Sequence, residues 1–324
     1  MSKKNILFIN GIPDNHKVKV RKIKKDGGVS WGGSGSANLS NFLQNDQFDL
    51  STVTFDTNRD QKLPRKMIHA VFNEISDPDS HKIALKKADD FYKAVSGNLP
   101  FFNAPSNVMK TTRDNIYQIL QGINKLHVPK TVRIQPKSPS DIYNTIKKED
   151  FKFPVIFRQA GDHGGVSTIL IKDTMEEFYT FPLDGRDYYL TQFVDYIEDD
   201  LYRKHRLVVM DGEVYLRHVK FSDQWIVHQK TLISNPEELQ KAASEHFLIE
   251  MKSVIQPIVK EIYNRLKLDY FGIDCYIDKD MNILVFEINA NMSIFLQAEG
   301  DIFKDHVEVI RQALIKMIEK RTTR

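Results

Sequence analysis

The sequence contains almost no cysteine, and it has no long apolar run. Cys275 is the single cysteine among 324 residues, which excludes an intrachain disulfide framework and a zinc site built from cysteines. No stretch approaches the roughly 18 apolar residues of a membrane-spanning helix. The first apolar run, "ILFI" at residues 6–9, is too short for the apolar part of a signal peptide. We therefore expect a cytoplasmic protein without a membrane partner.

An excess of charge of one sign is also missing. The 46 basic and 43 acidic residues leave a net charge of +3, which is too small to indicate a nucleic-acid-binding protein. The hydrophobic share of 41% and the charged share of 27% are those of an ordinary globular protein. A chain of this length has room for two or three subdomains with a buried core. Nucleic acid is therefore not an expected partner.

Two common nucleotide-binding signatures are missing as well. The glycines Gly161, Gly164 and Gly165 are not followed by Lys-Ser or Lys-Thr, so they do not form a P-loop. In "WGGSGSAN" (31–38), Asn38 occupies the place of the third glycine of the dinucleotide fingerprint. We interpret this second segment as a mobile substrate loop, and a structural linker is the open alternative.

The order of expected helices and strands indicates an α/β region followed by an α+β region. Strands at 5–10, 51–56 and 67–73 and a helix at 81–95 predict an N-terminal α/β domain. The proline-containing stretch 98–108 is a domain boundary. Beyond it, strands are expected at 154–159, 166–173, 187–197, 206–219 and 270–289, and helices at 112–123, 174–181, 236–247, 250–266 and 304–320. Asp211-Gly212 is a strong hairpin signal, so this second part should contain antiparallel hairpins.

Acidic and amide side chains gather in "FGIDCYIDKDMNILVFEINAN" (271–291). Glu287 and Asn289 are two residues apart and therefore share one face of a strand. If the chain turns at 279–282, Asp274 lies directly opposite Glu287, and Cys275 points to the other, buried face. Two carboxylates that close repel each other unless a cation lies between them, and oxygen ligands of this kind suit Mg²⁺. The alternative is one acid on a surface hairpin and the other paired with Arg or Lys.

A glycine loop follows the expected strand 154–159. Arg158 ends that strand, and a cationic guanidinium there can bind a phosphate through two hydrogen bonds. Gly161, Gly164 and Gly165 let backbone N–H groups converge on an anion. His163 also lies in this loop, either as a ligand or as a surface residue. A glycine-rich β-hairpin without a ligand is the open alternative.

Two further segments have both a functional and a structural interpretation. Residues 17–25, "KVKVRKIKK", contain six basic residues interleaved with apolar ones. They form either a solvated hairpin or arm, or a docking site for an acidic acceptor such as a peptide or a phosphorylated metabolite. Residues 221–230 contain Trp225, His228 and Lys230, which form either a substrate-binding loop or a loop with a packed tryptophan.

Taken in order, these segments resemble the ATP-grasp superfamily, and most closely its glutathione synthetase and RimK-like (ribosomal-protein glutamate ligase) branch. The resemblance runs from Val108 to about Gln297. The matching motifs are "TTRDN", "FPVIFRQ", "GDHGG", "YYLTQFV", "RKHRLVVMDGEVYLRH", "FGIDCYI" and "LVFEINANMS". The last, an acid–x–Asn strand end after an upstream Asp, is the most specific of them.

The resemblance implies roles for individual residues. Mg²⁺ against the ATP phosphates would be held by Asp274, Glu287 and Asn289. ATP itself would be bound by two segments. The first is the strand end with its glycine loop, which contains Arg158, Gly161, His163, Gly164 and Gly165. The second is a hinge, Gln192, Phe193 and Val194, whose backbone contacts adenine, and Asp199 or Asp200 would contact the ribose. The transferred phosphoryl and acyl groups would face Arg206 and Arg217.

The resemblance also implies the architecture. The expected fold is mixed α/β and α+β: an N-terminal pre-ATP-grasp domain at 1–107, a central lid subdomain at 108–191, and a C-terminal antiparallel-sheet subdomain at 192–324. The chain departs from the family at two places. RimK-like members often read Arg-Asp-Lys where this chain has Asn115 as the third residue, and Arg158 stands where a lysine is usual.

Enzymes of this kind activate a carboxylate with ATP and join it to an amine, releasing ADP. The resemblance therefore implies an ADP-forming carboxylate–amine ligase with ATP and Mg²⁺ as cofactors. Small-molecule or peptide substrates are the expected partners, and a homo-oligomer is an open alternative because dimers and tetramers are common in the family. Two other functions stay open: phosphoryl transfer to a small molecule, and nucleotide binding without catalysis.

Overall fold

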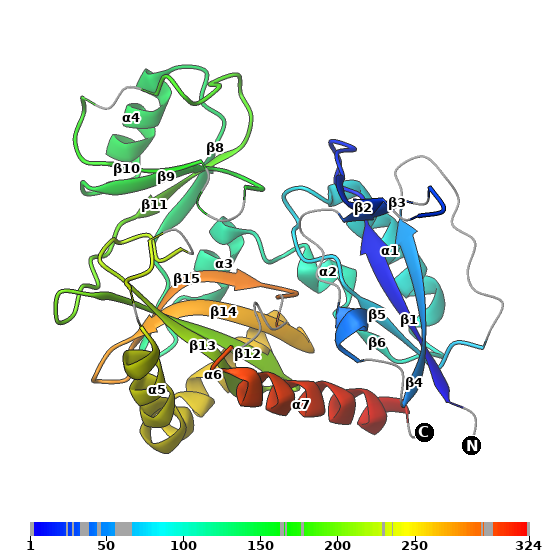
Figure 1. Ribbon diagram of the computed structural model, residues 1–324. Helices are drawn as coiled ribbons and strands as arrows, with labels where there is room; N and C mark the ends of the chain where they lie inside the picture. Colours follow the sequence, from blue (N-terminus) through cyan, green and yellow to red (C-terminus); the bar gives the residue numbers. More distant parts are fainter. Residues whose placement is uncertain are drawn as a thin grey trace.

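The computed structural model of the protein describes residues 3–23, 25–27, 29–32, 39–43, 47–55, 67–162, 165, 167–175, 178–228, 231–234, 236–292, 294 and 301–322. These residues form three main sheets and a separate two-stranded ribbon. Figure 1 shows the sheets as three parts of the molecule, with the N-terminal part on one side and the other two stacked on the opposite side.

The N-terminal part is built on a parallel sheet in the order β4-β1-β5-β6. Its strands are β4 (Phe48–Phe55), β1 (Lys4–Gly11), β5 (Ala70–Asn73) and β6 (Phe101–Phe102). The apolar run of β1 is fully buried, as expected for a parallel strand covered on both faces. Helices α1 (Lys82–Val95) and α2 (Pro105–Val108) lie beside this sheet. The prediction of an N-terminal α/β part is confirmed.

Two short elements lie between β1 and β4 along the chain. Strands β2 (Lys19–Ile23) and β3 (Val29–Gly32) form an antiparallel hairpin, and a 3₁₀ turn covers Leu39–Phe42. The carboxylate of Glu74, at the end of β5, accepts a hydrogen bond of 3.0 Å from the backbone N–H of Ser40 in this turn. Residues 33–38 of the expected substrate loop lie outside the described residues.

The central part is an antiparallel sheet in the order β10-β9-β11-β8, with one helix packed on it. The elements are β8 (Thr131–Ile134), α4 (Pro139–Lys148), β9 (Val155–Gln159), β10 (Thr168–Ile171) and β11 (Tyr188–Gln192). Ile142 and Ile146 of α4 pack against Phe157 and Tyr188 of the sheet. The short helix expected at 174–181 is wrong for the residues that are described there, which form turns.

The C-terminal part is a five-stranded sheet in the order β13-β12-β14-β15-β7. The strands are β7 (Leu126–His127), β12 (Tyr202–Met210), β13 (Glu213–Ser222), β14 (Tyr270–Ile277) and β15 (Ile283–Asn289), and the helices are α3 (Arg113–Leu120), α5 (Glu237–His246), a π-helical turn (Phe247–Met251), α6 (Lys252–Leu266) and α7 (Lys304–Thr322). The predicted hairpin at Asp211-Gly212 is confirmed, and both residues have positive φ as a two-residue turn requires.

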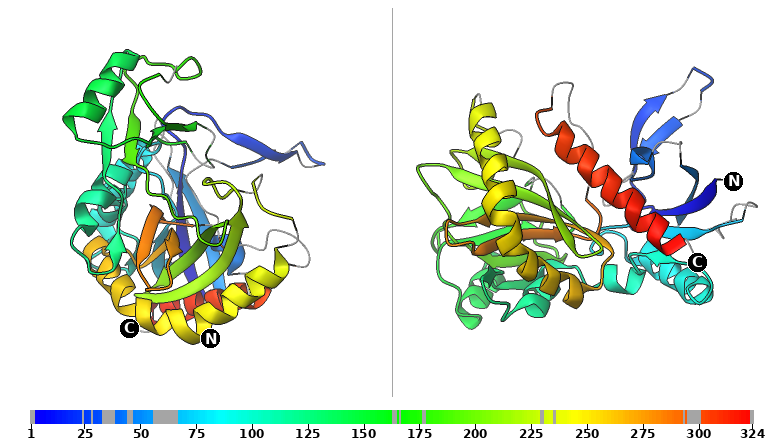
Figure 2. Two further views of the ribbon diagram at one scale, coloured as in Figure 1. Left: turned by 90° about the vertical axis from the view of Figure 1, so that its left-hand side faces the viewer. Right: turned by 90° about the horizontal axis from the view of Figure 1, so that it is seen from below.

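The N-terminal and C-terminal sheets are joined by a buried asparagine and by helix α7. The Asn103 side chain donates to the backbone carbonyls of Tyr270 at 2.7 Å and Ala290 at 2.6 Å, and it accepts from the Tyr270 backbone N–H at 3.0 Å. Helix α7 buries its apolar face against residues of both sheets, and Figure 2 (right) shows it lying between them. These contacts fix the N-terminal part close to the ends of β14 and β15. The three-domain division at 107 and 191 stays a prediction.

No helix in the described part of the chain combines the length and the hydropathy that a membrane-spanning segment requires.

Candidate functional site

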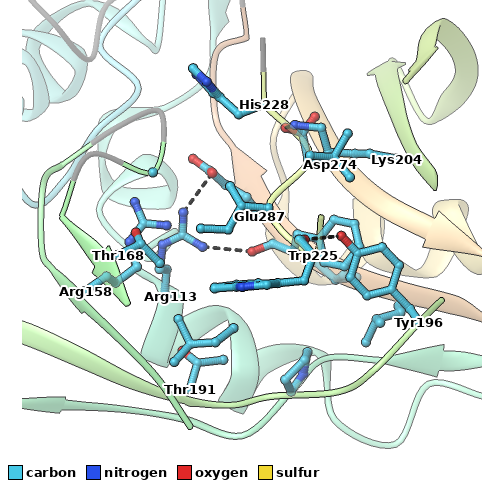
Figure 3. Close-up of a pocket in the computed structure, with 18 of the residues that line it drawn as sticks. Arg113, Arg158, Thr168, Thr191, Tyr196, Lys204, Trp225, His228, Asp274 and Glu287 are labelled. Carbon is cyan, nitrogen blue, oxygen red and sulfur yellow. Dashed lines mark hydrogen bonds and ion pairs between the residues drawn. The ribbon is translucent and has the colours of Figure 1, made fainter. Parts of the chain in front are cut away.

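A cavity of about 580 Å³ lies between the central sheet and the C-terminal sheet. Its wall combines charged residues with an apolar, partly aromatic region. Its lining residues include Arg113, Arg158, Gly165, Gln192, Phe193, Val194, Tyr196, Lys204, Arg206, Lys220, Trp225, His228, Asp274, Glu287 and Asn289. Figure 3 shows Arg113 and Arg158 on one side, Asp274 and Lys204 on the other, and Glu287 between them.

The predicted opposition of the two carboxylates is confirmed by the strand register. Asp274 on β14 pairs with Glu287 on β15, and Gly272 pairs with Asn289. The register shifts by one residue next to Asp274, because Phe286 is an extra residue without a partner on β14. Without this bulge, Asp274 would lie opposite Phe286. Cys275 points to the other face and is fully buried, as the strand alternation predicts.

Gly272 is required for the wall next to these carboxylates. A Cβ atom placed on Gly272 would lie 2.7 Å from the Cβ of Met292, closer than side chains approach each other. Met292 lines the cavity, and the Tyr270 hydroxyl donates to its backbone carbonyl. The glycine therefore lets the chain after β15 fold back over β14 at the edge of the cavity.

Asp274 is held by cations from the neighbouring strand β12. Nε and Nη2 of Arg206 each lie 2.8 Å from one of its carboxylate oxygens, and Nζ of Lys204 lies 3.4 Å from Oδ2. Burial alone would raise the pKa of the Asp274 carboxyl, but Arg206 and Lys204 outweigh burial and keep that pKa well below its usual range. Asp274 is therefore a permanent anion in the wall of the cavity.

Glu287 is held differently, by a residue from helix α3. One guanidinium nitrogen of Arg113 lies 2.8 Å from Oε2 of Glu287, and another donates to the backbone carbonyl of Phe286 at 2.8 Å. The Glu287 side chain is 27% exposed, against 8% for Asp274. Of the two opposed carboxylates, Glu287 is thus the one that faces the open space of the cavity.

Two further cations have lowered pKa values. Burial, strengthened by Arg206 and Lys204 nearby, lowers the pKa of Lys220 to about 8. Burial, strengthened by Arg113, lowers the pKa of Arg158 to about 10. Positive charge crowded into a partly desolvated space favours the binding of an anion, because an anion relieves the mutual repulsion.

Part of the glycine loop next to Arg158 lines the cavity. A guanidinium nitrogen of Arg158 donates to the backbone carbonyl of Asp162, which folds the loop back on the strand end. Gly165 lines the cavity and has a φ of +74°, which favours glycine. Gly161, with a φ of +77°, lines a small adjacent cavity of about 40 Å³ together with Arg158 and Glu287. His163 and Gly164 lie outside the described residues.

The predicted hinge forms the apolar end of the cavity. Gln192, Phe193 and Val194 line it where β11 runs towards β12. The Phe193 ring packs edge-on against Trp225 with a centroid distance of 5.6 Å. The Tyr196 hydroxyl donates to the backbone carbonyl of Trp225 at 2.6 Å, which holds the 223–228 loop against the hinge (Figure 3). The hinge and the 223–228 loop together form the apolar end of the cavity.

Besides Gly161, two described site residues that were predicted are not brought to this cavity. Arg217 is buried instead, with Nε donating to the backbone carbonyl of Ile294 at 3.1 Å and Nη2 lying 2.8 Å from the Asp301 carboxylate. A second bulge explains the difference, because β12 and β13 change register beside Arg206 and leave Arg217 as the extra residue. Asp199 lies in an exposed turn before β12, with a φ of +51°.

Sequence reasoning did not assign three cations that line the cavity: Arg113, Lys204 and Lys220. The position of Lys204 could have been predicted from the sequence, because this residue precedes Arg206 by two residues and so shares its strand face. Lys220 pairs with Lys204 across the two strands only because of the bulge at Arg217. Arg113 begins helix α3, far from β15 in the sequence, and no spacing rule connects it with Glu287.

The carboxylates in the cavity are too few to form a complete protein-made metal site. Among the described residues, no group of three or more His, Cys, Asp and Glu side chains could hold a metal ion. Asp274, Glu287 and Asn289 supply oxygen donors, which Mg²⁺ prefers. Mg²⁺ commonly takes one or two carboxylates from the protein and the remaining oxygens from water and substrate phosphates. The donor set therefore fits Mg²⁺ together with a phosphorylated ligand.

Comparison with known proteins gives a family match and a common fold. A model of the RimK-like ATP-grasp domain matches residues 113–302. The coenzyme gamma-F420-2:alpha-L-glutamate ligase of Methanocaldococcus jannaschii is 29% identical over 117 residues, which are 35% of this chain and 39% of that protein. The matched region thus spans well under half the length of that curated relative.

Solved structures resemble almost the whole chain. The D-alanine-D-alanine ligase of Coxiella burnetii has a TM-score of 0.60 at 12% identity, with 99% of this chain and 96% of that chain covered. The ATP-grasp ligase PsnB, solved with a minimal precursor, Mg and ADP, has a TM-score of 0.53 at 14% identity, with 98% of both chains covered. Identities this low show the fold alone, and that fold is ATP-grasp. Because the family model covers more than half of the chain, the protein belongs to the RimK-like ATP-grasp family.

Proposed function

We propose that the protein is an ADP-forming ligase that uses ATP to activate a carboxylate as an acylphosphate and joins it to an amine. One observation carries this proposal: a single cavity has an apolar, partly aromatic end and, next to it, five cationic side chains around two opposed carboxylates. The aromatic end suits a flat base and the cations suit a chain of phosphates. Membership of the RimK-like ATP-grasp family supports the same function.

In this proposal the base of ATP lies at the apolar end of the cavity, against the hinge and Trp225. Gln192, Phe193 and Val194 would contact its edge, and Trp225 would cover one face. Arg158 and the backbone N–H of Gly165 would hold the first phosphates, since both residues line the cavity. The assignment of the ribose to Asp199 or Asp200 finds no support in the exposed position of that turn.

Mg²⁺ would be held by Glu287 and Asn289, which share one strand face, with Asp274 opposite Glu287. Bound there, Mg²⁺ would neutralise and align the terminal phosphates. Glu287 is the ligand better able to change partner, because its side chain is 27% exposed against 8% for Asp274. Each carboxylate oxygen can accept more than one bond, so Asp274 can serve as a ligand while it remains bonded to Arg206.

The residues of this chain would act by charge and by position. A carboxylate oxygen of the donor attacks the γ-phosphorus of ATP, the bond to the β-phosphate oxygen breaks, and ADP leaves. The amine nitrogen then attacks the acyl carbon, inorganic phosphate leaves, and the amine loses its proton. Arg206, Lys204 and Lys220 lie where they would stabilise the negative charge of the transferred phosphoryl group.

The substrate class is proposed from the printed functions of relatives together with the charge of the cavity. The curated relative is named as a glutamate ligase, and PsnB was also solved with a precursor peptide. A cavity with more cations than carboxylates favours an anionic donor. We therefore propose an amino acid or a related carboxylic acid as the donor and a small molecule or a peptide as the amine.

Hydroxylamine trapping tests this function without knowledge of the natural amine. The protein is incubated with ATP, Mg²⁺, hydroxylamine and pools of amino acids and dicarboxylic acids, and hydroxamate and ADP are measured. A ligase should form both in equal amounts. Glu287→Gln should abolish both products, whereas Glu213→Gln, an equal change at an exposed position on β13, should leave them unchanged.

The same assay separates the alternatives. A stable phosphate ester with ADP but without hydroxamate would replace the ligase proposal with phosphoryl transfer to a small molecule. ATP binding without ADP release in any pool would favour a non-catalytic nucleotide-binding protein. Hydroxamate formation that is unaffected by Glu287→Gln would contradict the proposed role of the opposed carboxylates.

A further inference from the structure

The basic segment at residues 17–25 has no role in the cavity described above. Lys17, Lys19, Arg21, Lys22, Lys24 and Lys25 give it six positive charges and no negative one. Without these six, the chain has 40 basic and 43 acidic residues. The segment therefore concentrates positive charge on a protein that is otherwise slightly negative, and such an asymmetry attracts an acidic partner to one place.

Part of this segment is one strand of a hairpin. Strand β2 (Lys19–Ile23) pairs with β3 (Val29–Gly32), and the register shifts at Arg21, which is an extra residue. The bulge keeps Val20 and Ile23 on the same face, although they are three residues apart. Val20 is 60% exposed and Ile23 is 70% exposed, and Val18 before the strand is 40% exposed. One face of the hairpin thus presents aliphatic side chains to solvent.

The backbone of the hairpin is also open to a partner. In the described part of the chain, β2 and β3 pair only with each other, so each strand has an edge of unpaired N–H and C=O groups. Figure 2 (left) shows this blue ribbon extending away from the rest of the N-terminal part. A two-stranded ribbon is only marginally stable by itself, and a third strand would stabilise it.

We propose that the hairpin docks an acidic polypeptide segment in extended conformation, which adds to the ribbon as a third strand. Backbone groups of the partner would pair with the open strand edge. Its acidic side chains would meet the basic residues, and its apolar side chains would cover Val20 and Ile23. Nucleic acid and anionic lipid would also be attracted by the charge, but neither offers backbone N–H and C=O groups in strand spacing.

The consequence for turnover rests on the proposed function. If the protein is a ligase, a polypeptide held by the hairpin is a substrate or a substrate carrier, and the hairpin selects it by charge. The hairpin would then act through the affinity for the polypeptide and not through the chemical step. Binding to the hairpin itself does not depend on ATP or on the carboxylates of the cavity.

The test uses the full chain and fluorescence anisotropy. The probe is a fluorescein-labelled peptide of alternating Glu and Val, compared with its Gln-Val analogue, a labelled oligo-dT strand, and vesicles containing phosphatidylserine. The charge variant is Lys19→Ser with Lys22→Ser, and the apolar variant is Val20→Thr with Ile23→Thr, which keeps β-branched residues in the strand. The matched control is Lys147→Ser with Lys148→Ser, two exposed lysines at the end of α4.

The proposal predicts that the Glu-Val peptide binds and that the Gln-Val peptide does not. Both hairpin variants should weaken binding by about tenfold, as expected when a charge or an apolar contact is lost at a small interface. The control variant should bind like the unmodified protein. Unchanged binding in both hairpin variants, or preferential binding of oligo-dT or vesicles, would overturn the proposal.

Failure of the docking proposal can be told apart from failure of the ligase proposal. Hydroxamate formation from small carboxylic acids, together with no peptide binding, would refute docking and leave the ligase intact. Hairpin-dependent peptide binding without any ADP formation would refute the ligase and leave docking intact. In the ligase, the hairpin variants should raise KM for a peptide substrate and leave kcat for small substrates unchanged.

Discussion

The two sheets that face each other across the cavity supply different chemistry. The C-terminal sheet presents charged side chains on adjacent strands, namely Lys204, Arg206, Lys220, Asp274 and Glu287. The central sheet presents a single charge, Arg158, among neutral residues such as Ile156, Thr168, Thr191 and Gln192. The charges of the C-terminal wall lie on adjacent strands of one sheet, so their mutual geometry is fixed. In the proposed ligase, the C-terminal wall would stabilise the transferred phosphoryl group and the central wall would enclose the ligand.

The largest expected effect comes from the same isosteric change on the two opposed carboxylates. Asp274→Asn removes the partner of Arg206 in a buried pair, so the free energy of unfolding should fall by about 3 kcal/mol. Glu287→Gln acts on a more exposed pair and should cost less than about 1 kcal/mol. Both should reduce ADP formation by about a hundredfold or more. Denaturant unfolding and the hydroxamate assay measure the two effects separately.

Equal destabilisation by the two variants would contradict the difference in their environments. Full activity of Glu287→Gln would remove the opposed carboxylates from the mechanism. A melted Glu287→Gln protein would instead give this residue a structural role, and the activity loss would carry no chemical information.

The next comparison concerns two cations on one strand. Arg217→Met breaks a buried ion pair with Asp301 and should lower the free energy of unfolding by about 3 kcal/mol. Lys220→Met changes a residue in the cavity wall and should weaken nucleotide binding while leaving the unfolding transition nearly unchanged. Calorimetric titration with ADP and thermal unfolding of both variants would check this. The reverse assignment of the two effects would restore the sequence-based role of Arg217.

A smaller effect is expected where the central wall meets the N-terminal part. Nη2 of Arg133 on β8 lies 2.5 Å from the Asp79 carboxylate, and Nη1 lies 2.9 Å from Asp187. Arg133→Ala should cost about 2 kcal/mol and should increase hydrogen exchange in the central sheet, because the loop carrying Asp79 is released. Arg186→Ala removes an exposed pair with Asp184 and is the control, with no measurable change expected. Similar exchange in both variants would show that this contact does not restrain the wall.

The smallest expected effect is a pH dependence carried by Lys220. Its pKa of about 8 in the folded protein means that its positive charge is lost as the pH rises from 7 to 9. Affinity for ADP should therefore fall by about threefold over this range, since one cation of the cavity is neutralised. An unfolded chain keeps this proton up to about pH 10, so the folded state should gain stability between pH 8 and 10.

Lys220→Arg provides the matched control for this pH dependence. The guanidinium stays charged at pH 9, so the affinity for ADP should become nearly independent of pH between 7 and 9. The same fall in affinity for both proteins would assign the pH dependence to a different group.

The sequence predicted most of the fold because its strands and turns carry local signals. The buried run of β1 and the Asp211-Gly212 turn each depend on a few neighbouring residues, and both are found as expected. The expected helix at 174–181 was wrong, since its apolar spacing is satisfied by packing of Phe178 and Phe181 onto the central sheet from turns. Tertiary packing outweighed the local pattern there.

The strand faces of the site could be predicted from the sequence, but the two bulges that change the strand register could not. Strand alternation correctly put Glu287 and Asn289 on one face, and the predicted pairing with Asp274 holds because Phe286 is an extra residue. The bulge at Arg217 had the opposite result, since it moved Arg217 out of the expected face and brought Lys220 opposite Lys204. A bulge depends on how the whole sheet twists and packs, and no local residue signal marks either one.

The buried position of Cys275 allows the opening of the C-terminal sheet to be measured by thiol labelling. This thiol is the only one in the chain, it follows Asp274 on the opposite face of β14, and burial raises its pKa well above the ordinary value. A thiol reagent such as dithionitrobenzoate can then react only when strand β14 separates from the helices that cover it. The labelling rate would therefore measure how far an added nucleotide or peptide suppresses the opening that exposes Cys275. No engineered probe is needed for this measurement.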